Sequence, residues 1–190
     1  MRIIAGSAKS RTIVAPKGFQ TRPTQDYVRE SLFNIIQRDV PGATVLDLFA
    51  GTGALALEAL SRGAVKAVLV DSSRQAIDCV RRNVQTLGFS RQADILQGDW
   101  QTMVERLSQT KQCFDLVFLD PPYRLSAYAE MTDMLQSKGL LAQHALIVIE
   151  HRKNVPVALS PAFIPRDCRT YGDTMIHMLT FDAGGNTDGK

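Results

Sequence analysis

Two short stretches of the chain carry residues that could do chemistry. In the first, residues 45–53 (Val-Leu-Asp-Leu-Phe-Ala-Gly-Thr-Gly), a hydrophobic strand runs into a glycine-rich turn. Without a Cβ at Gly51 and Gly53, the backbone can bend sharply and present its N–H groups to a ligand, beside the positive N-terminus of the following helix. Asp71 ends the next strand about 20 residues later, the spacing at which a carboxylate reaches a ribose hydroxyl pair. Together these features predict a nucleoside-containing cofactor site.

The second stretch is Asp120-Pro121-Pro122-Tyr123, which follows a run over residues 114–119 that is apolar except for Asp115. Two prolines stiffen the backbone, so the Asp120 carboxylate and the Pro121 carbonyl can both accept hydrogen bonds from one donor group. Tyr123 offers a flat face for stacking. Acceptors beside an aromatic ring form a receptor for a planar base with an exocyclic amine. Alone, the tetrapeptide has a second, less favoured explanation as a loop in which Asp120 caps a turn.

The elements that position both stretches alternate from residue 43 onward, which is typical of a parallel sheet covered on both faces. The expected strands are residues 44–49, 67–71, 93–97, 114–119 and 145–149, and the expected helices are 53–62, 73–87, 100–108 and 126–138. The helix over 73–87 has Ser73 as its expected N-cap and Gly88 as its expected end. Residues 167–181 favour two further strands that turn at 171–173. We therefore predict an α/β fold, a doubly wound and mostly parallel seven-stranded sheet with a terminal antiparallel hairpin. Ligands of such sheets bind beyond the carboxyl ends of the strands, so both stretches should face one crevice.

Outside this core, which we place at residues 43–181, the chain has an extension and a tail. Residues 1–42 are expected to form a basic extension packed on the core, with a small hairpin (2–5 and 11–15) and a helix that has Thr24 as its N-cap and an apolar face ending at Ile36. The positive charge of this extension favours a polyanion such as nucleic acid, although a solvated basic edge explains it equally well. Residues 182–190 are expected to be disordered.

Composition limits the remaining possibilities. The chain has 190 residues, 45% of them hydrophobic, and a net charge of +3, which suits one domain of ordinary size. Its three cysteines are far apart, and no apolar run has the length of a membrane span or the form of a signal peptide. We therefore expect a cytoplasmic protein. The three histidines are widely spaced, so no metal site is expected.

Several blocks resemble a known family. The pairing of residues 47–53 with Asp-Pro-Pro-Tyr at 120–123 resembles the Rossmann-type S-adenosylmethionine-dependent amino-methyltransferases. More narrowly, the chain resembles the RsmD-type 16S rRNA guanine-N2 methyltransferases over about residues 2–181. The further blocks that carry this resemblance are Arg22-Pro-Thr24, Arg29-Glu-Ser-Leu-Phe-Asn34, Glu58-Ala-Leu-Ser-Arg-Gly63 and Tyr171-Gly-Asp-Thr174.

The resemblance implies a class I methyltransferase fold, S-adenosyl-L-methionine as cofactor, and ribosomal RNA as partner, within the small ribosomal subunit or its precursor. It implies a monomer that needs neither metal nor membrane. The glycine turn would hold the methionine part of the cofactor, Asp71 the ribose, and Asp99 with Trp100 the adenine. The candidate cofactor-binding residues are Asp47, Phe49, Ala50, Gly51, Gly53, Asp71, Ser72, Asp99 and Trp100. The candidate residues for the target base are Asp120, Pro121, Pro122 and Tyr123, and those for the cofactor or RNA entrance are Lys9, Arg11, Arg22, Thr24 and Arg29.

The implied reaction is methyl transfer to the exocyclic N2 amine of a guanine. Hydrogen bonds from this amine to Asp120 and the Pro121 carbonyl would favour a pyramidal nitrogen and stabilise the positive charge that develops on it. The same acceptors suit N6 of adenine in DNA or RNA, so the residues leave both bases open. An NAD-dependent dehydrogenase would share the glycine turn but leaves residues 120–123 without a role, and a nucleotide-binding module without activity fits the fold alone.

Overall fold

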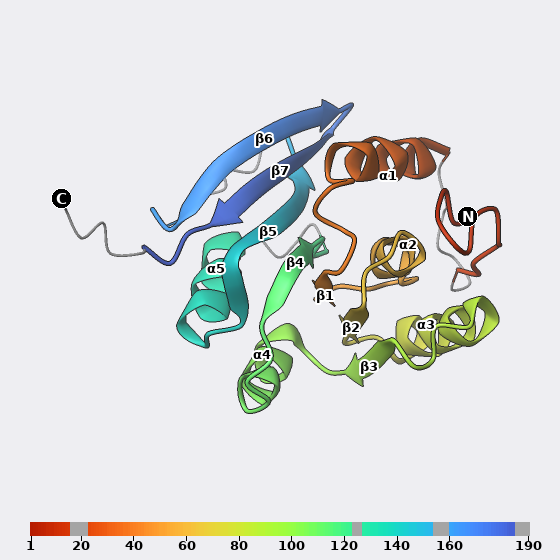
Figure 1. Ribbon diagram of the computed structural model, residues 1–190, viewed down its shortest axis with the longest axis horizontal. Coiled ribbons are helices and arrows are strands. Elements are labelled where there is room, and N and C mark those ends of the chain that lie inside the picture. The colour runs from red at the N-terminus through yellow and green to blue at the C-terminus, as the bar shows by residue number, and fades with distance from the viewer. Residues whose placement is uncertain (16–22, 123–126, 154–159, 185–190) are drawn as a thin grey trace.

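A seven-stranded sheet in the order β3-β2-β1-β4-β5-β7-β6 forms the centre of the molecule (Figure 1). The computed structural model describes residues 1–15, 23–122, 127–153 and 160–184, with the side chains of 23–25 excepted. The strands are β1 (Thr44–Asp47), β2 (Lys66–Asp71), β3 (Ala93–Gln97), β4 (Phe114–Leu119), β5 (Leu141–Arg152), β6 (Phe163–Tyr171) and β7 (Thr174–Phe181). Strands β1 to β5 are parallel, and β7 is antiparallel to both β5 and β6. The predicted sheet with its terminal hairpin is confirmed.

Helices cover both faces of this sheet. They are α1 (Pro23–Ile35), α2 (Ala54–Ser61), α3 (Arg74–Leu87), α4 (Trp100–Ser108) and α5 (Tyr128–Ser137). Helices α1, α2 and α3 share one hydrophobic cluster with one face of the sheet, and α4 and α5 share a second cluster with the other face (Figure 1). Because strand side chains alternate between faces, Val45, Leu116 and Val148 belong to the first cluster while Leu46, Val117 and Ile147 belong to the second.

Sequence signals at the helix ends act as expected in α3. The Ser73 hydroxyl accepts a hydrogen bond from the Ala76 N–H, and Gly88 ends the helix with a φ of 82°. Such a left-handed conformation favours glycine at a helix C-terminus. Helix α3 therefore has the bounds that the pattern of Ser73, Gly88 and the apolar residues between them predicts.

The N-terminal residues pack against α2, where Glu58 forms a buried acceptor. Its carboxylate accepts hydrogen bonds from the backbone N–H of Ile4 (2.7 Å) and Ala5 (3.0 Å) and from Arg62 Nε (2.7 Å). Gly6 lies so close to this helix that a Cβ would be 1.8 Å from the Ser61 carbonyl oxygen. The expected hairpin is reduced to one antiparallel bridge between Arg2 and Thr12.

Several predicted boundaries were wrong. Those of β5 and β6 depend on strand pairing between distant segments, which the local sequence does not show. Strand β5 covers 141–152 rather than 145–149, since β7 pairs with it as far as Arg152. Strand β6 begins at 163 rather than 167, with a bulge after Pro165, a residue that has no N–H to donate. Helix α1 begins at Pro23, so Thr24 lies inside it and is not its N-cap, and the helix ends at Ile35. Strand β1 ends at Asp47, two residues before the predicted end, where the glycine turn begins.

Three expectations concern the tail, membranes and metals. Of the tail predicted to be disordered, residues 185–190 lie outside the described part of the chain. None of the described helices is long and apolar enough to cross a membrane, and the described residues contain no group of three His, Cys, Asp or Glu that could hold a metal. Two of the histidines, His151 and His177, are nevertheless close in space, with their ring centroids 4.7 Å apart.

Candidate active site

The glycine turn lies between β1 and α2 with the geometry that its sequence predicts. Gly51 and Gly53 have φ angles of 54° and 79°, which side chains with a Cβ rarely adopt. A Cβ on Gly53 would also lie 3.1 Å from carbon atoms of Leu57 and Leu69. Gly53 directly precedes α2, so the turn places backbone N–H groups at the positive end of this helix.

Asp71 connects this turn to the ends of two neighbouring strands. One carboxylate oxygen accepts a hydrogen bond from the Gly51 N–H and the other from the Ser73 N–H, both at 2.8 Å. The Asp71 carbonyl accepts a further bond from the Gly98 N–H at 3.1 Å, which brings the end of β3 to the same place. Each carboxylate oxygen keeps a free lone pair, so Asp71 can still accept a bond from a ribose hydroxyl.

Three carboxyl groups meet at the carboxyl ends of β1, β4 and β5, which are neighbours in the sheet. Asp47 ends β1, Asp120 directly follows β4, and Glu150 lies near the end of β5. Residues two apart in a strand point to the same face of the sheet. The three acids each lie two residues after a member of the first hydrophobic cluster, namely Val45, Phe118 and Val148. All three therefore point to the face covered by α1, α2 and α3. The strand order therefore produces an acidic cluster from residues far apart in the sequence.

Asp47 is the most buried member of this cluster, at 1% exposed, and its Oδ1 has no hydrogen-bond partner among the described residues. The pKa of Asp47 is raised from 3.8 to about 7, chiefly by burial. The charge of Asp71 also contributes to the rise, and hydrogen bonds from the backbone at Phe49 and Ala56 oppose it. Burying an ionised carboxylate without a hydrogen-bond partner costs free energy, unless a positively charged group binds beside it.

Asp120 and Glu150 lie nearer the surface, where both are partly exposed. Loss of water, then the charges of Glu150 and Asp47, raise the pKa of Asp120 well above its ordinary value. Loss of water also raises the pKa of Glu150. Within the described ranges, none of the three carboxylates forms an ion pair with Lys, Arg or His. The cluster is thus arranged to receive a cation or a group rich in N–H donors.

Sequence reasoning missed Glu150. The available signal was its position, because it follows the apolar run 145–149 just as Asp120 follows the mostly apolar run 114–119. Of the other residues predicted for the target base, Pro121 is buried and Pro122 exposed, and Tyr123 lies outside the described residues.

The residues predicted for the adenine have structural roles of their own. The Asp99 carboxylate caps α4, accepting bonds from the Thr102 N–H (2.9 Å) and hydroxyl (2.7 Å), and these bonds lower its pKa. Trp100 is 6% exposed and belongs to the second hydrophobic cluster. Asp99 is exposed and still has lone pairs for a ligand. The other candidates lie around the turn: Phe49 and Gly51 partly exposed, Ala50 buried and Ser72 exposed.

Two of the five residues proposed for the entrance, Arg29 and Arg11, are engaged in contacts within the protein. Arg29 is 4% exposed and donates to the Arg2 carbonyl (2.6 Å) and to Asp26 (3.1 Å). Arg11 donates to the carbonyls of Thr86 and Leu87 at the end of α3. Lys9 is exposed, Arg22 lies outside the described residues, and the side chain of Thr24 is not described.

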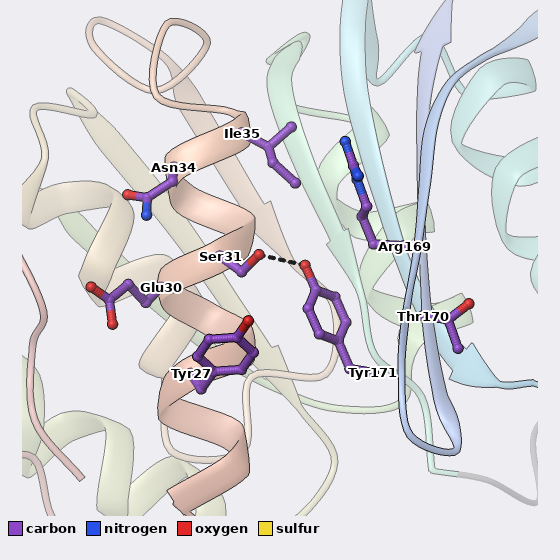
Figure 2. Close-up of a pocket in the computed structure, with 8 residues that line it drawn as sticks. All are labelled: Tyr27, Glu30, Ser31, Asn34, Ile35, Arg169, Thr170 and Tyr171. Atoms are coloured by element: carbon purple, nitrogen blue, oxygen red, sulfur yellow. Dashed lines mark hydrogen bonds between the residues drawn. The ribbon is translucent and has the colours of Figure 1, made fainter.

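A groove opens between α1 and the end of β6 (Figure 2). Its volume is about 740 Å³, and its lining residues are Tyr27, Glu30, Ser31, Asn34, Ile35, Arg169, Thr170 and Tyr171. Figure 2 shows the Ser31 and Tyr171 hydroxyls meeting between the two walls, at 2.5 Å. The Tyr27 ring lies edge to face with Tyr171, at 6.2 Å, and is 63% exposed. Strand β6 runs in the same direction as β4 and β5, so the carboxyl ends of all three strands lie at the same end of the sheet. The groove therefore lies at the end of the sheet that carries the acidic cluster.

Comparison with known proteins identifies the family. The family model described as conserved hypothetical protein 95 matches residues 1–180. The chain belongs to this family. A curated relative from Escherichia coli K12, ribosomal RNA small subunit methyltransferase D, is 37% identical over 79% of this chain and 74% of its own length. A relative from Bacillus subtilis, named as a candidate rRNA methyltransferase, is 36% identical over 92% of this chain and 95% of its own.

Solved structures agree with this assignment. A protein of Escherichia coli described as a candidate methyltransferase is 31% identical, with a TM-score of 0.86 over 97% of this chain and 99% of its own. Membership of the conserved hypothetical protein 95 family and this likeness confirm the predicted resemblance and the methyltransferase type of fold.

Proposed function

We propose that the protein transfers a methyl group from S-adenosyl-L-methionine to the exocyclic N2 amine of a guanine in 16S ribosomal RNA, within the small subunit or its precursor. The observation that carries this proposal is the acidic cluster of Asp47, Asp120 and Glu150 beside the glycine turn, for which the described residues provide no cation. The small-subunit rRNA methyltransferases among the relatives support ribosomal RNA as the substrate.

The residues around the turn fit S-adenosylmethionine, which carries an ammonium and a sulfonium group and supplies an electrophilic methyl group when bound. Asp47 has a buried oxygen without a described partner, the group that a cation would stabilise. Gly51 and Gly53 let the backbone approach a ligand closely, and Asp71 lies beside them with lone pairs to spare. A neutral ligand would leave the charge of Asp47 uncompensated.

Asp120 and the Pro121 carbonyl would hold the amine that receives the methyl group. Acceptors on both N–H bonds favour a pyramidal nitrogen whose lone pair points away from them. They also stabilise the positive charge that grows on nitrogen during the transfer, and this charge is larger in the transition state than in the bound base. The methylated nitrogen then loses a proton, for which Asp120 with its raised pKa is a suitable acceptor.

The direct test uses S-adenosylmethionine with a labelled methyl group. The protein is incubated with ribosomal RNA, with assembled small subunits and with DNA, and the labelled product is digested to nucleosides. We expect N2-methylguanosine from RNA or from subunits. Label in N6-methyladenosine would support the adenine alternative instead, and the absence of label from all three acceptors would refute methyl transfer to nucleic acid.

Replacing Asp71 with alanine should weaken cofactor binding. The change removes a ligand acceptor and also the two bonds that hold the turn at Gly51 and the start of α3 at Ser73. Charge-assisted hydrogen bonds contribute about 1.5–3 kcal/mol each, so we expect the dissociation constant to rise at least about tenfold. Isothermal titration calorimetry measures it, with Asp78→Ala on the exposed face of α3 as the matched control. An unchanged constant would remove Asp71 from the site.

The groove of Figure 2 is our candidate for the surface that contacts RNA beside the target base. Tyr27 is exposed at its rim, and base stacking on an aromatic ring contributes about 1–3 kcal/mol. We expect Tyr27→Ala to raise the KM for RNA about tenfold and to leave cofactor affinity unchanged, while Tyr27→Phe, which keeps the ring, behaves as the wild type. Equal KM values for all three proteins would show that RNA does not contact Tyr27.

A further inference from the structure

Glu150 occupies a fixed place directly beside Asp120. Strands β4 and β5 are in register at Phe118 with Val148 and at Leu119 with Ile149, so the next residues of the two strands, Asp120 and Glu150, are neighbours. Adjacent strands are about 4.8 Å apart, so both carboxyl groups can contact one small planar ligand. On its other side Glu150 pairs with Ile176 of β7, which holds its backbone between two strands.

A structural role does not account for an acid at this position. Two carboxyl groups on neighbouring strands repel each other, and the charge of Glu150 does act on Asp120. No described Lys, Arg or His pairs with Glu150, and its side chain is partly exposed. A ligand with several adjacent N–H donors would satisfy both acids at once.

Guanine and adenine differ at the ring atom next to the amine. In guanine the N1–H lies beside the N2 amine, so these two adjacent positions are both donors, whereas adenine presents a lone pair at N1 beside its N6 amine. With the amine held by Asp120 and the Pro121 carbonyl, the neighbouring ring atom would face Glu150, the acceptor on the adjacent strand. The carboxylate of Glu150 would accept a bond from guanine N1–H and repel the lone pair of adenine N1.

We propose that Glu150 selects guanine by accepting the N1–H hydrogen bond of the target base. This inference rests on the proposed function and deepens it, because it assigns the choice of base to one side chain. Residues 120–123 alone suit either amine, and a site for adenine would need a donor where Glu150 stands. The substitution Glu150→Gln supplies such a donor with almost no change in shape.

The test compares two synthetic RNA fragments that span the methylated position and differ only in the target base. One carries guanine, and the other carries 2,6-diaminopurine, which keeps the 2-amine but has a lone pair at N1. We expect the wild-type protein to prefer guanine in kcat/KM, and Glu150→Gln to lower the guanine-to-diaminopurine ratio at least about tenfold, since one base-edge contact is worth about 1–3 kcal/mol of discrimination. Glu105→Gln, an exposed acid on α4, is the matched control.

Each outcome has a distinct meaning. An unchanged ratio in Glu150→Gln overturns the inference, even if the overall rate falls, because a residue that only shapes the site would affect both bases alike. Unchanged cofactor affinity and unchanged melting temperature establish that the variant is folded. If the wild-type protein methylates neither RNA fragment and no ribosomal RNA, the proposed function fails instead.

Discussion

The substitution Asp120→Ala is expected to abolish methyl transfer while cofactor binding stays nearly intact. Asp120 directly follows β4, where we propose that the target amine binds, whereas the glycine turn and Asp71 follow or end β1 and β2. Removing one group that stabilises the developing charge in an active site lowers kcat by about a hundredfold to a thousandfold. Single-turnover transfer of labelled methyl, measured with calorimetric affinity for the cofactor, separates the two effects.

The matched variant for this experiment is Asp120→Asn, which keeps one oxygen acceptor in the same place. We expect it to retain more activity than Asp120→Ala and less than the wild type, because the amide oxygen is a weaker acceptor and the amide cannot take up the proton. Neither variant should lower the melting temperature, since each removes a repulsive charge next to Glu150 and Asp47. Unchanged turnover in Asp120→Ala would refute the role given to this carboxylate.

Stability without cofactor should fall as the pH rises from 4 to 8. The folded pKa of Asp47, about 7, lies above the ordinary 3.8 that it recovers on unfolding, so the folded state holds a proton that the unfolded state has already lost in this window. The contribution of Asp47 to the free energy of unfolding is therefore fully present below about pH 4 and is lost progressively as the pH rises to about 7. At about 1.4 kcal/mol per pH unit, Asp47 alone accounts for a loss of up to about 4 kcal/mol.

Urea unfolding at several pH values measures this loss, with Asp47→Asn as the variant in which the slope should be reduced. S-adenosylmethionine should bind more tightly as the pH rises through 7, because its positive groups would stabilise the ionised Asp47. A slope that is identical in wild type and Asp47→Asn would show that Asp47 titrates normally, and a cofactor affinity independent of pH would separate Asp47 from the cofactor.

The sequence was sufficient to predict the sheet because each of its signals is local. The mostly apolar run 114–119 predicted β4, and Ser73 and Gly88 predicted the ends of α3. The spacing of the glycine turn and Asp71 predicted one site, and the structure brings the two together through the hydrogen bond from the Gly51 N–H to Asp71. The boundaries that failed, such as those of β5, depend on pairing with β7 more than 20 residues later in the chain.

The parts of the site that were missed depend on contacts between distant segments. Glu150 reaches Asp120 only because β5 lies next to β4, and Ser31 and Tyr171 meet across 140 residues of sequence to form the groove. Charge counting also misled, because Arg29 contributes to the basic excess of the first 40 residues while its side chain is buried. A count of charges cannot tell a packed guanidinium from a free one.

The bonds of Glu58 bear on the order in which the chain folds. Ile4 and Ala5 find their acceptor 54 and 53 residues later in the sequence, so the first segment is synthesised well before its partner exists. Until the segment docks, the Glu58 carboxylate lacks two of the hydrogen bonds that offset the free-energy cost of burying it. Closing so long a loop also costs conformational entropy, which is offset only when the contact has formed. We therefore expect the N-terminal segment to dock late in folding, after α2 has formed and packed on the sheet.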